Sequence, residues 1–233
     1  KNATVQVGSD MTVGDWKVGA ALSYTDGRAT YDAGEGDSNT YGFALYGTWL
    51  VENGQFLDLI AKYSRLDQDF SIEGMNGSYD NNAFALSAEY GWRFELGSVA
   101  FVEPQAEFTY FRVMGDDFAT SNDVKVEQDD YDSYIGRIGV RGGFKFPNNK
   151  GNLYARVSYL YDFDGEMHAD VRSLTGRGHN TIDEDLGGSW VEYGIGANFN
   201  LTDRTYSYVD LERSSGGEVK ENWRWNIGVR HVF

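Results

Sequence analysis

The residue types that most often carry out catalysis are sparse and scattered in this sequence. No histidine has a serine and an aspartate at a spacing that would build a catalytic triad on neighbouring strands. Asp162, Asp164 and Glu166 alternate along the chain, but their spacing does not fit a calcium-binding loop. We therefore expect no catalytic residues, no metal site and no cofactor. The three histidines are His168, His179 and His231.

Charged residues instead recur at alternate positions of aromatic-rich segments. In an antiparallel pair of strands, facing positions have numbers with a constant sum, and Glu103 with Arg141 gives the same sum as Glu107 with Arg137. These residues predict two stacked ion pairs on one face of a sheet. We expect this face to line a hydrated interior, with the charges at Glu103, Glu107, Arg137, Arg141, Arg156, Glu192, Asp210, Glu212, Arg224 and Arg230.

The last thirteen residues, from Glu221 to Phe233, show the kind of strand on which we expect such charges to lie. Every second residue from Trp223 to Phe233 is apolar except His231, whereas the residues between them are mostly polar or charged. This alternation predicts a strand with one apolar face and one polar face. In a soluble protein its aromatic edge would promote aggregation, but in a membrane barrel the apolar face meets lipid.

The connections between the predicted strands alternate in length. Short turns at Gly14-Asp15, Asn53-Gly54 and further sites alternate with long, polar segments, of which the longest spans residues 164–187. Short turns on one rim and long loops on the other are typical of outer-membrane barrels, with the short turns on the periplasmic side. We therefore predict an all-β fold, a transmembrane antiparallel up-and-down β-barrel. Pro104 lies inside one predicted strand and indicates a local break in the hydrogen-bond ladder.

Composition agrees with this class and excludes others. The 233 residues contain no cysteine, and no apolar run is long enough for a transmembrane helix. A mean hydropathy of −0.51 is compatible with a barrel because only alternate residues face lipid. The net charge of −16 argues against nucleic-acid binding, which needs clustered lysine and arginine.

Three stretches resemble the translocator domain of classical autotransporters of the type V secretion pathway. They are Phe101-Val-Glu-Pro-Gln-Ala-Glu107, Gly188-Ser-Trp-Val-Glu-Tyr-Gly-Ile-Gly-Ala-Asn198, and Tyr208 to Gly217 followed by Trp223 to Arg230. The resemblance extends through nearly the whole chain, and the ending on Phe233 resembles the final strand of outer-membrane barrels. It implies an assembly signal formed by Trp225, Gly228, His231 and Phe233. His231 departs from the family pattern, which usually has tyrosine or an apolar residue there.

The resemblance implies a barrel in the outer membrane of a Gram-negative-type cell that anchors and translocates an N-terminal passenger. Its expected partners are outer-membrane lipid and lipopolysaccharide, the barrel assembly machinery and the upstream passenger. The long loops are expected to be extracellular and the C-terminus periplasmic. The alternative is a diffusion porin or small-solute channel, and a third reading is an outer-membrane hydrolase or adhesin that uses the long loops.

The strand count predicts that one strand is missing from residues 1–233. We count eleven strands, whereas bacterial single-chain barrels have even numbers. The first strand also enters from the long-loop side, so a strand rising from the other side is expected before it. We therefore expect a single translocator domain over 1–233 whose first strand and linker helix lie upstream. Residues 3–13 and 221–233 should be the two edges of an open sheet.

Overall fold

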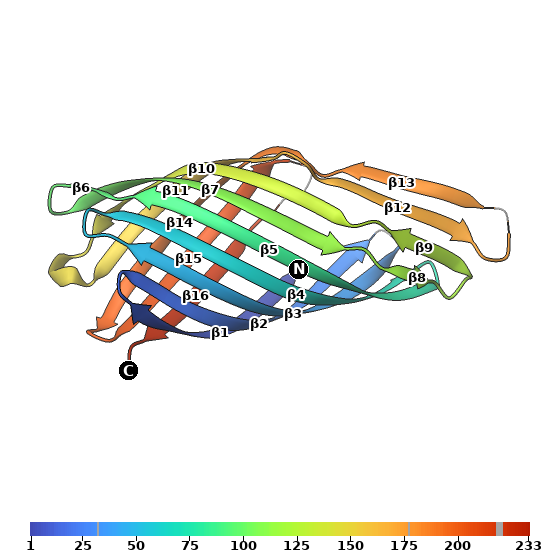
Figure 1. Cartoon of the computed structure of the whole chain (residues 1–233), viewed down its shortest axis with the longest axis horizontal. Coiled ribbons are helices and arrows are strands. Elements are labelled where there is room, and N and C mark those ends of the chain that lie inside the picture. Colours follow the sequence, from blue (N-terminus) through green and yellow to red (C-terminus); the bar gives the residue numbers. More distant parts are fainter. Residues whose placement is uncertain (32, 177, 218–220) are drawn as a thin grey trace.

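The protein is built almost entirely from antiparallel strands. The computed structural model describes residues 1–31, 33–176, 178–217 and 221–233. Within them, one sheet runs through eleven long strands in chain order and curls into an incomplete barrel (Figure 1). The strands are β1 (Asn2–Val13), β2 (Trp16–Tyr31), β3 (Gly34–Leu50), β4 (Gln55–Ile72), β5 (Met75–Trp92), β7 (Ala100–Met114), β10 (Tyr131–Lys145), β11 (Gly151–Asp162), β14 (Gly188–Thr202), β15 (Thr205–Gly216) and β16 (Arg224–His231).

The two faces of this sheet differ in polarity, as the period-two pattern predicts. The outer face exposes large apolar side chains along every strand, for example Leu22, Phe43, Ile138 and Ile227. Their neighbours in sequence point to the opposite face because successive side chains of a strand alternate. The opposite face is the concave one, because Arg230 and Asp10 from the two ends of the sheet meet on it. The apolar residues are thus placed to meet lipid.

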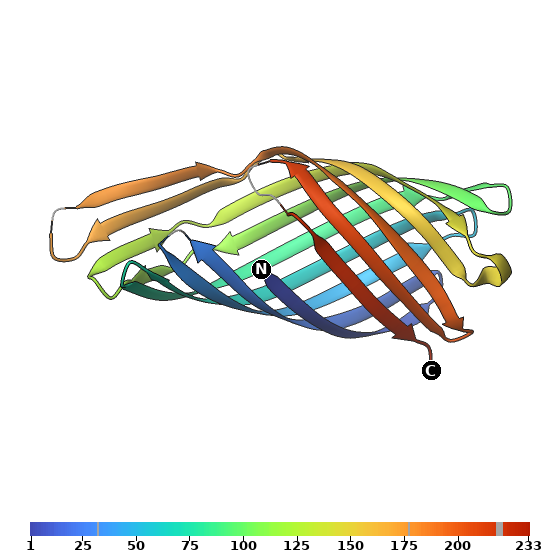
Figure 2. The same cartoon turned by 180° about the vertical axis from the view of Figure 1, so that it is seen from behind.

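The two edges of the sheet are β1 and β16, as the sequence predicts. Each pairs with one neighbour, β1 with β2 and β16 with β15. Ten antiparallel steps separate β1 from β16, so the two edge strands run in the same direction. Figure 2 shows them as the two borders of the opening in the barrel. In the described part of the chain, no backbone ladder joins them.

Pro104 interrupts the ladder on one side of β7 only. Toward β10 the register continues through Pro104, which lies opposite Val140. Toward the other side, pairing with β5 ends at Gln105 and resumes with the short strand β6 (Phe94–Leu96) at Val102. A proline has no N–H to donate, so the expected break occurs and divides one long strand into β5 and β6.

The expectation of long irregular loops is wrong for four of the five long connections. Residues 114–133 and 164–187 contain β8 (Asp117–Ala119), β9 (Val124–Gln128), β12 (Glu166–Ser173) and β13 (His179–Asp185). These strands form a second sheet in the order β13-β12-β9-β8, called the arm here, which projects beyond the barrel (Figure 1). The dense acidic residues concealed the alternation, and Glu184, opposite Met167, interrupts the face that carries most of the apolar residues. Residues 26–39 likewise belong mainly to β2 and β3, and residues 70–82 belong mainly to β4 and β5.

One short 3₁₀ helix, Pro147–Asn149, forms the turn between β10 and β11. Within the described residues, the protein has no helix of the length and apolar character that membrane crossing requires.

Candidate functional site

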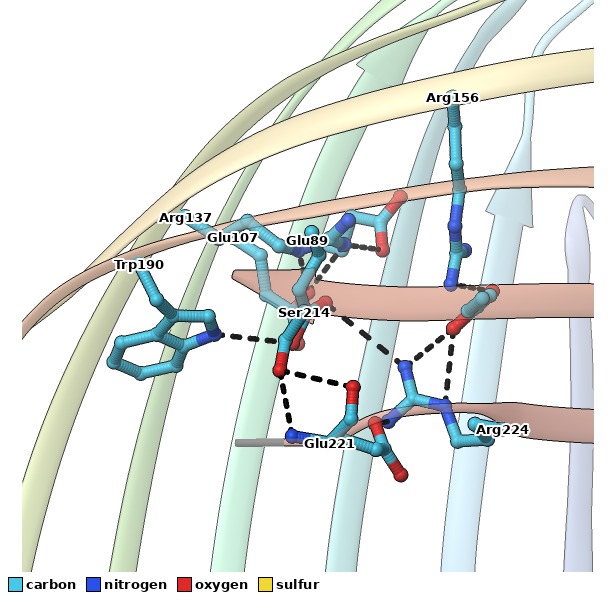
Figure 3. A network of polar contacts seen from close by, with 10 residues as sticks. Glu89, Glu107, Arg137, Arg156, Trp190, Ser214, Glu221 and Arg224 are labelled. Atoms are coloured by element: carbon cyan, nitrogen blue, oxygen red, sulfur yellow. Dashed lines mark hydrogen bonds and ion pairs between the residues drawn. The ribbon is translucent and has the colours of Figure 1, made fainter. Parts of the chain in front are cut away.

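The concave face of the barrel carries a band of linked ion pairs. In its centre, Arg137 of β10 donates through Nε to Glu107 of β7 at 2.6 Å. Its Nη2 reaches one strand further, to Glu89 of β5, also at 2.6 Å. Arg137 and Glu107 lie opposite each other in the register, as the sequence predicts. Arg137 therefore links the three strands β5, β7 and β10 (Figure 3). Glu107 also accepts a hydrogen bond from Ser87.

A second cluster surrounds Glu103, which is only 1% exposed. Arg141 donates to one oxygen of its carboxylate at 2.5 Å, and Arg93 donates to the other at 2.8 Å. The predicted pairing of Glu103 with Arg141 is therefore confirmed, with Arg93 as an additional partner. The guanidinium carbon of Arg93 lies over the Phe101 ring, and that of Arg141 lies over the Tyr154 ring. The two cations compensate the burial of the carboxylate, and the aromatic rings attract the guanidinium groups.

A third cluster lies on the last strands of the sheet. Glu212 of β15 accepts contacts from Arg156 of β11 and Arg224 of β16, and it is 4% exposed. Glu192 lies at the edge of this group, where it accepts a hydrogen bond from the Trp190 indole at 3.1 Å. Figure 3 shows how these side chains converge with those of the central cluster from several strands. Asp210 lies apart from Glu212 and contacts the Tyr154 hydroxyl.

The remaining predicted charge on this face, Arg230, lies at the open edge. It donates through Nη2 and Nε to the two carboxylate oxygens of Asp10 on β1, at 2.5 and 3.1 Å. This fork spans the gap between the two edge strands. Sequence analysis did not single out Asp10, although it lies on the polar side of a strand whose alternate residues are apolar. Its partner could not be found from the sequence because no hairpin links the two strands.

The residues of the expected assembly signal occupy the final strand. Trp225 exposes most of its side chain on the outer face. Gly228 lies opposite Tyr208, whose ring covers it so closely that a Cβ on the glycine would be 2.3 Å from a ring carbon. The His231 ring is 3.0 Å from the Thr205 hydroxyl and packs edge-on against Phe233, which is fully exposed. These four residues therefore form no single cluster.

The chemistry that this face offers is electrostatic. Its carboxylates and guanidinium groups are largely paired with one another, which gives a hydrated wall with both signs of charge and no strong excess of either. Among the described residues, no group of three histidine, aspartate or glutamate side chains could hold a metal ion. Alternation with apolar residues places Glu89 and Arg93 on this face from the sequence alone, whereas the contact of Tyr154 with Asp210 could not be inferred from it.

A curled antiparallel sheet with an apolar outside and a charged inside defines a membrane β-barrel of the outer-membrane type. Residues 1–212 match the family described as "Autotransporter beta-domain". The chain therefore belongs to the autotransporter β-domain family, whose members are outer-membrane barrels.

Individual relatives agree with this membership. The pertactin autotransporter of Bordetella parapertussis is 30% identical over all of this chain and 26% of its own length. The BrkA autotransporter of Bordetella pertussis is 31% identical over 94% of this chain and 22% of its own length. An uncharacterized Escherichia coli protein, YaiT, is 29% identical over 94% of this chain and 23% of its own length. The chain thus spans about a quarter of these curated relatives.

Solved structures show the same fold. The β domain of the Bordetella autotransporter BrkA superposes with a TM-score of 0.82 at 25% identity, covering all of this chain and 90% of that one. The translocator domain of NalP from Neisseria meningitidis gives a TM-score of 0.81 at 14% identity, with 100% and 81% coverage. The expected fold class and family are therefore confirmed.

Proposed function

We propose that this domain anchors an N-terminal passenger in the outer membrane and provides the route by which the passenger reaches the cell surface. The observation that carries the proposal is the band of internally paired charges on the concave face of a barrel of this family. A polypeptide in transit needs a hydrated wall without unpaired charges that would hold it. Arg137, Glu103 and Glu212 neutralise their partners across several strands and leave such a wall.

The orientation follows from the lengths of the connections. The short turns and Phe233 face the periplasm, and the arm faces the outside, because long segments of bacterial barrels are extracellular. Outer-membrane lipid contacts the apolar outer face, and lipopolysaccharide surrounds its outer half. The barrel assembly machinery reads the final strand, including Trp225, Gly228, His231 and Phe233. We assign no enzymatic step to the domain itself, whatever activity the passenger has.

The open edge of the sheet supports a further part of the proposal. Since β1 and β16 run in the same direction, one additional strand that is antiparallel to both would satisfy the free hydrogen-bonding groups of each. We propose that an upstream strand closes the domain formed by residues 1–233 and that a linker helix before this strand occupies the interior. In the closed barrel the Arg230–Asp10 ion pair would then pass over the inner face of the added strand. The added strand therefore needs a small inward-facing residue where the ion pair crosses it.

The test uses the natural full-length protein with an epitope tag upstream of this domain. On intact cells the tag is expected to be accessible to antibody and to added protease. A diffusion porin predicts a steady, solute-conducting channel in planar bilayers and no surface tag. A correctly inserted barrel, judged by heat-modifiable gel mobility, with an inaccessible tag would contradict the translocation role.

A further inference from the structure

The arginines on the outer face of the barrel all lie toward its long-loop end. Alternation with the exposed apolar side chains places four arginines and no lysine of the eleven long strands on this face, as far as the structure describes them. They are Arg28 of β2, Arg65 of β4, Arg112 of β7 and Arg213 of β15. A charged side chain that faces lipid is unfavourable unless it reaches the polar border of the membrane. Each of these arginines therefore needs an anionic partner at that border.

Three of the four arginines have aspartate partners within the protein. The ion pairs are Arg28 with Asp37, Arg65 with Asp67 and Asp80, and Arg112 with Asp130 and Asp132. Each of these arginines reaches an aspartate of the neighbouring strand, so the pairs join the strands at the long-loop rim. These three guanidinium groups are thus neutralised by the protein itself.

The surroundings of Arg213 are different. Its guanidinium carbon lies 5.5 Å from the centroid of the Trp223 ring, and its backbone lies opposite Tyr193 in the register. Its other described neighbours on the outer face are uncharged, namely Val191, Ile195, Leu211, Ser215 and Trp225. An aromatic ring beneath a guanidinium group fixes its orientation and leaves the N–H groups at its edge open to an anion.

The depth of Arg213 in the membrane indicates which anion it meets. Thr205 begins β15 beside a short turn, and Arg213 lies eight positions further along the strand. At about 3.3 Å per residue and a strand tilt of about 40°, Arg213 lies roughly 20 Å above that turn, whereas the apolar band of such barrels is about 25 Å tall. Tyr193 and Trp223 are residue types that concentrate at the border of this band. The long side chain of Arg213 can therefore extend to the headgroup layer.

We propose that Arg213, held against the Trp223 ring, binds a phosphate group of the phosphorylated glycolipid of the outer leaflet, the lipid A part of lipopolysaccharide. A guanidinium group forms two parallel hydrogen bonds to a phosphate, which makes arginine a preferred residue for this ligand. The outer-leaflet glycolipid is the favoured occupant because the site lies at the long-loop border. This assignment rests on the proposed orientation, in which that border faces the cell exterior.

The test compares phosphorylated and dephosphorylated forms of one glycolipid. The full-length protein is exchanged into detergent free of bound lipid and is titrated with diphosphoryl lipid A, dephosphorylated lipid A or phosphatidylglycerol. Native mass spectrometry measures the fraction of protein with bound lipid. The natural protein is expected to bind diphosphoryl lipid A several-fold more tightly than either of the other lipids.

Three variants locate the site. Arg213→Gln should lower the affinity for diphosphoryl lipid A several-fold, to that of the dephosphorylated form. Arg112→Gln is the matched control, because Arg112 is already engaged by Asp130 and Asp132, and its affinity should equal that of the natural protein. Arg213→Lys keeps a cation but loses the two parallel hydrogen bonds, so its affinity should lie between those of the natural protein and R213Q. Heat-modifiable gel mobility confirms that each variant is folded.

The outcomes that overturn the proposal are distinct. Equal affinities of the natural protein and R213Q for diphosphoryl lipid A would overturn it, as would an equal loss in R112Q. If R213Q does not fold, an affinity of R213K equal to that of the natural protein would overturn it. Equal or tighter binding of phosphatidylglycerol by the natural protein would overturn the assignment to the glycolipid.

A separate measurement tests the orientation on which the proposal rests. The chain contains no cysteine, so Thr175→Cys in the arm and Lys150→Cys in a short turn each provide a single labelling site in this domain. A membrane-impermeant maleimide added to intact cells is expected to label position 175 and not position 150. The reverse pattern would contradict the proposed orientation. The expected pattern together with equal lipid A binding by the natural protein and R213Q would overturn this inference alone.

Discussion

Arg230 and Asp10 are 220 positions apart in the sequence and form a two-pronged ion pair between the edges of an open sheet. The strands that carry them run in the same direction and share no backbone ladder in the described part of the chain. Each edge therefore has hydrogen-bonding groups that lipid cannot satisfy. The Arg230–Asp10 ion pair therefore links the two edges through side chains on the concave face.

The first prediction follows from this contact. Arg230→Asp places two carboxylates at the seam and should lower the fraction of folded, heat-modifiable barrel several-fold. Asp10→Arg should act in the same direction. The double exchange, Asp10→Arg with Arg230→Asp, restores an attractive pair and should recover most of the folded fraction. If the double variant is as defective as the two single variants combined, the pair does not act across the seam.

The second prediction concerns Glu212, which compensates two arginines. Glu212→Ala leaves Arg156 and Arg224 facing each other in a partly buried place, and should cost about 3–5 kcal/mol of unfolding free energy. Glu192→Ala is the matched control, since its contact with Arg224 is 3.9 Å long and the residue is more exposed. Urea unfolding in detergent micelles measures both variants. Equal losses of unfolding free energy in the two variants would show that the ion pairs of Glu212 stabilise the barrel no more than the contacts of Glu192.

The third prediction concerns the close packing of Tyr208 over Gly228. Gly228→Val places methyl groups where the tyrosine ring lies, and overpacking of this kind costs about 1–3 kcal/mol. Tyr208→Ala alone should also destabilise, because it removes the ring from the glycine backbone. Adding Tyr208→Ala to Gly228→Val should relieve the clash, so the double variant is expected to lose less than the sum. Strict additivity in the urea midpoint would contradict the contact.

The arm gives a pH-dependent prediction. The hydrogen bond from Thr181, with His179 nearby, lowers the pKa of Asp170 below its ordinary value. A lowered carboxylate pKa stabilises the folded arm above the unfolded pKa of about 3.9, and this contribution is lost as pH falls through the folded value. Thr181→Val should raise the pKa of Asp170 toward the ordinary value in a carboxyl NMR titration. An unchanged titration would mean that β12 and β13 do not pair in this register.

The sequence predicted the barrel well because lipid imposes a strict alternation on every strand. Eleven long strands, the two edges and the partners of Arg137 and Arg141 could all be inferred, because alternation fixes the faces and the constant sum of position numbers fixes which residues face each other. The arm was missed because water, unlike lipid, tolerates charge on either face. Its strands therefore show weaker alternation, and acidic residues such as Asp170 and Glu127 make these strands resemble loops in the sequence. The contact of Asp10 was missed because β1 and β16 are the two ends of the sheet and are not consecutive along the chain, so no connection between them indicates their relative register.

The fifth prediction concerns the inside and outside of the same strand. Ala44 and Leu45 are consecutive on β3, and Leu45 is 53% exposed on the outer face while Ala44 faces inward. A photo-crosslinking residue is placed at either position in the full-length protein, and export is slowed by a folded reporter in the passenger. This design asks directly whether the passenger passes through the concave interior.

The account predicts crosslinks from position 44 to the passenger during slowed export and their loss once export is complete, while position 45 crosslinks to lipid or to barrel assembly proteins. Crosslinking of the passenger from position 45 and not from position 44, with both variants folded and exporting, would contradict translocation through this barrel.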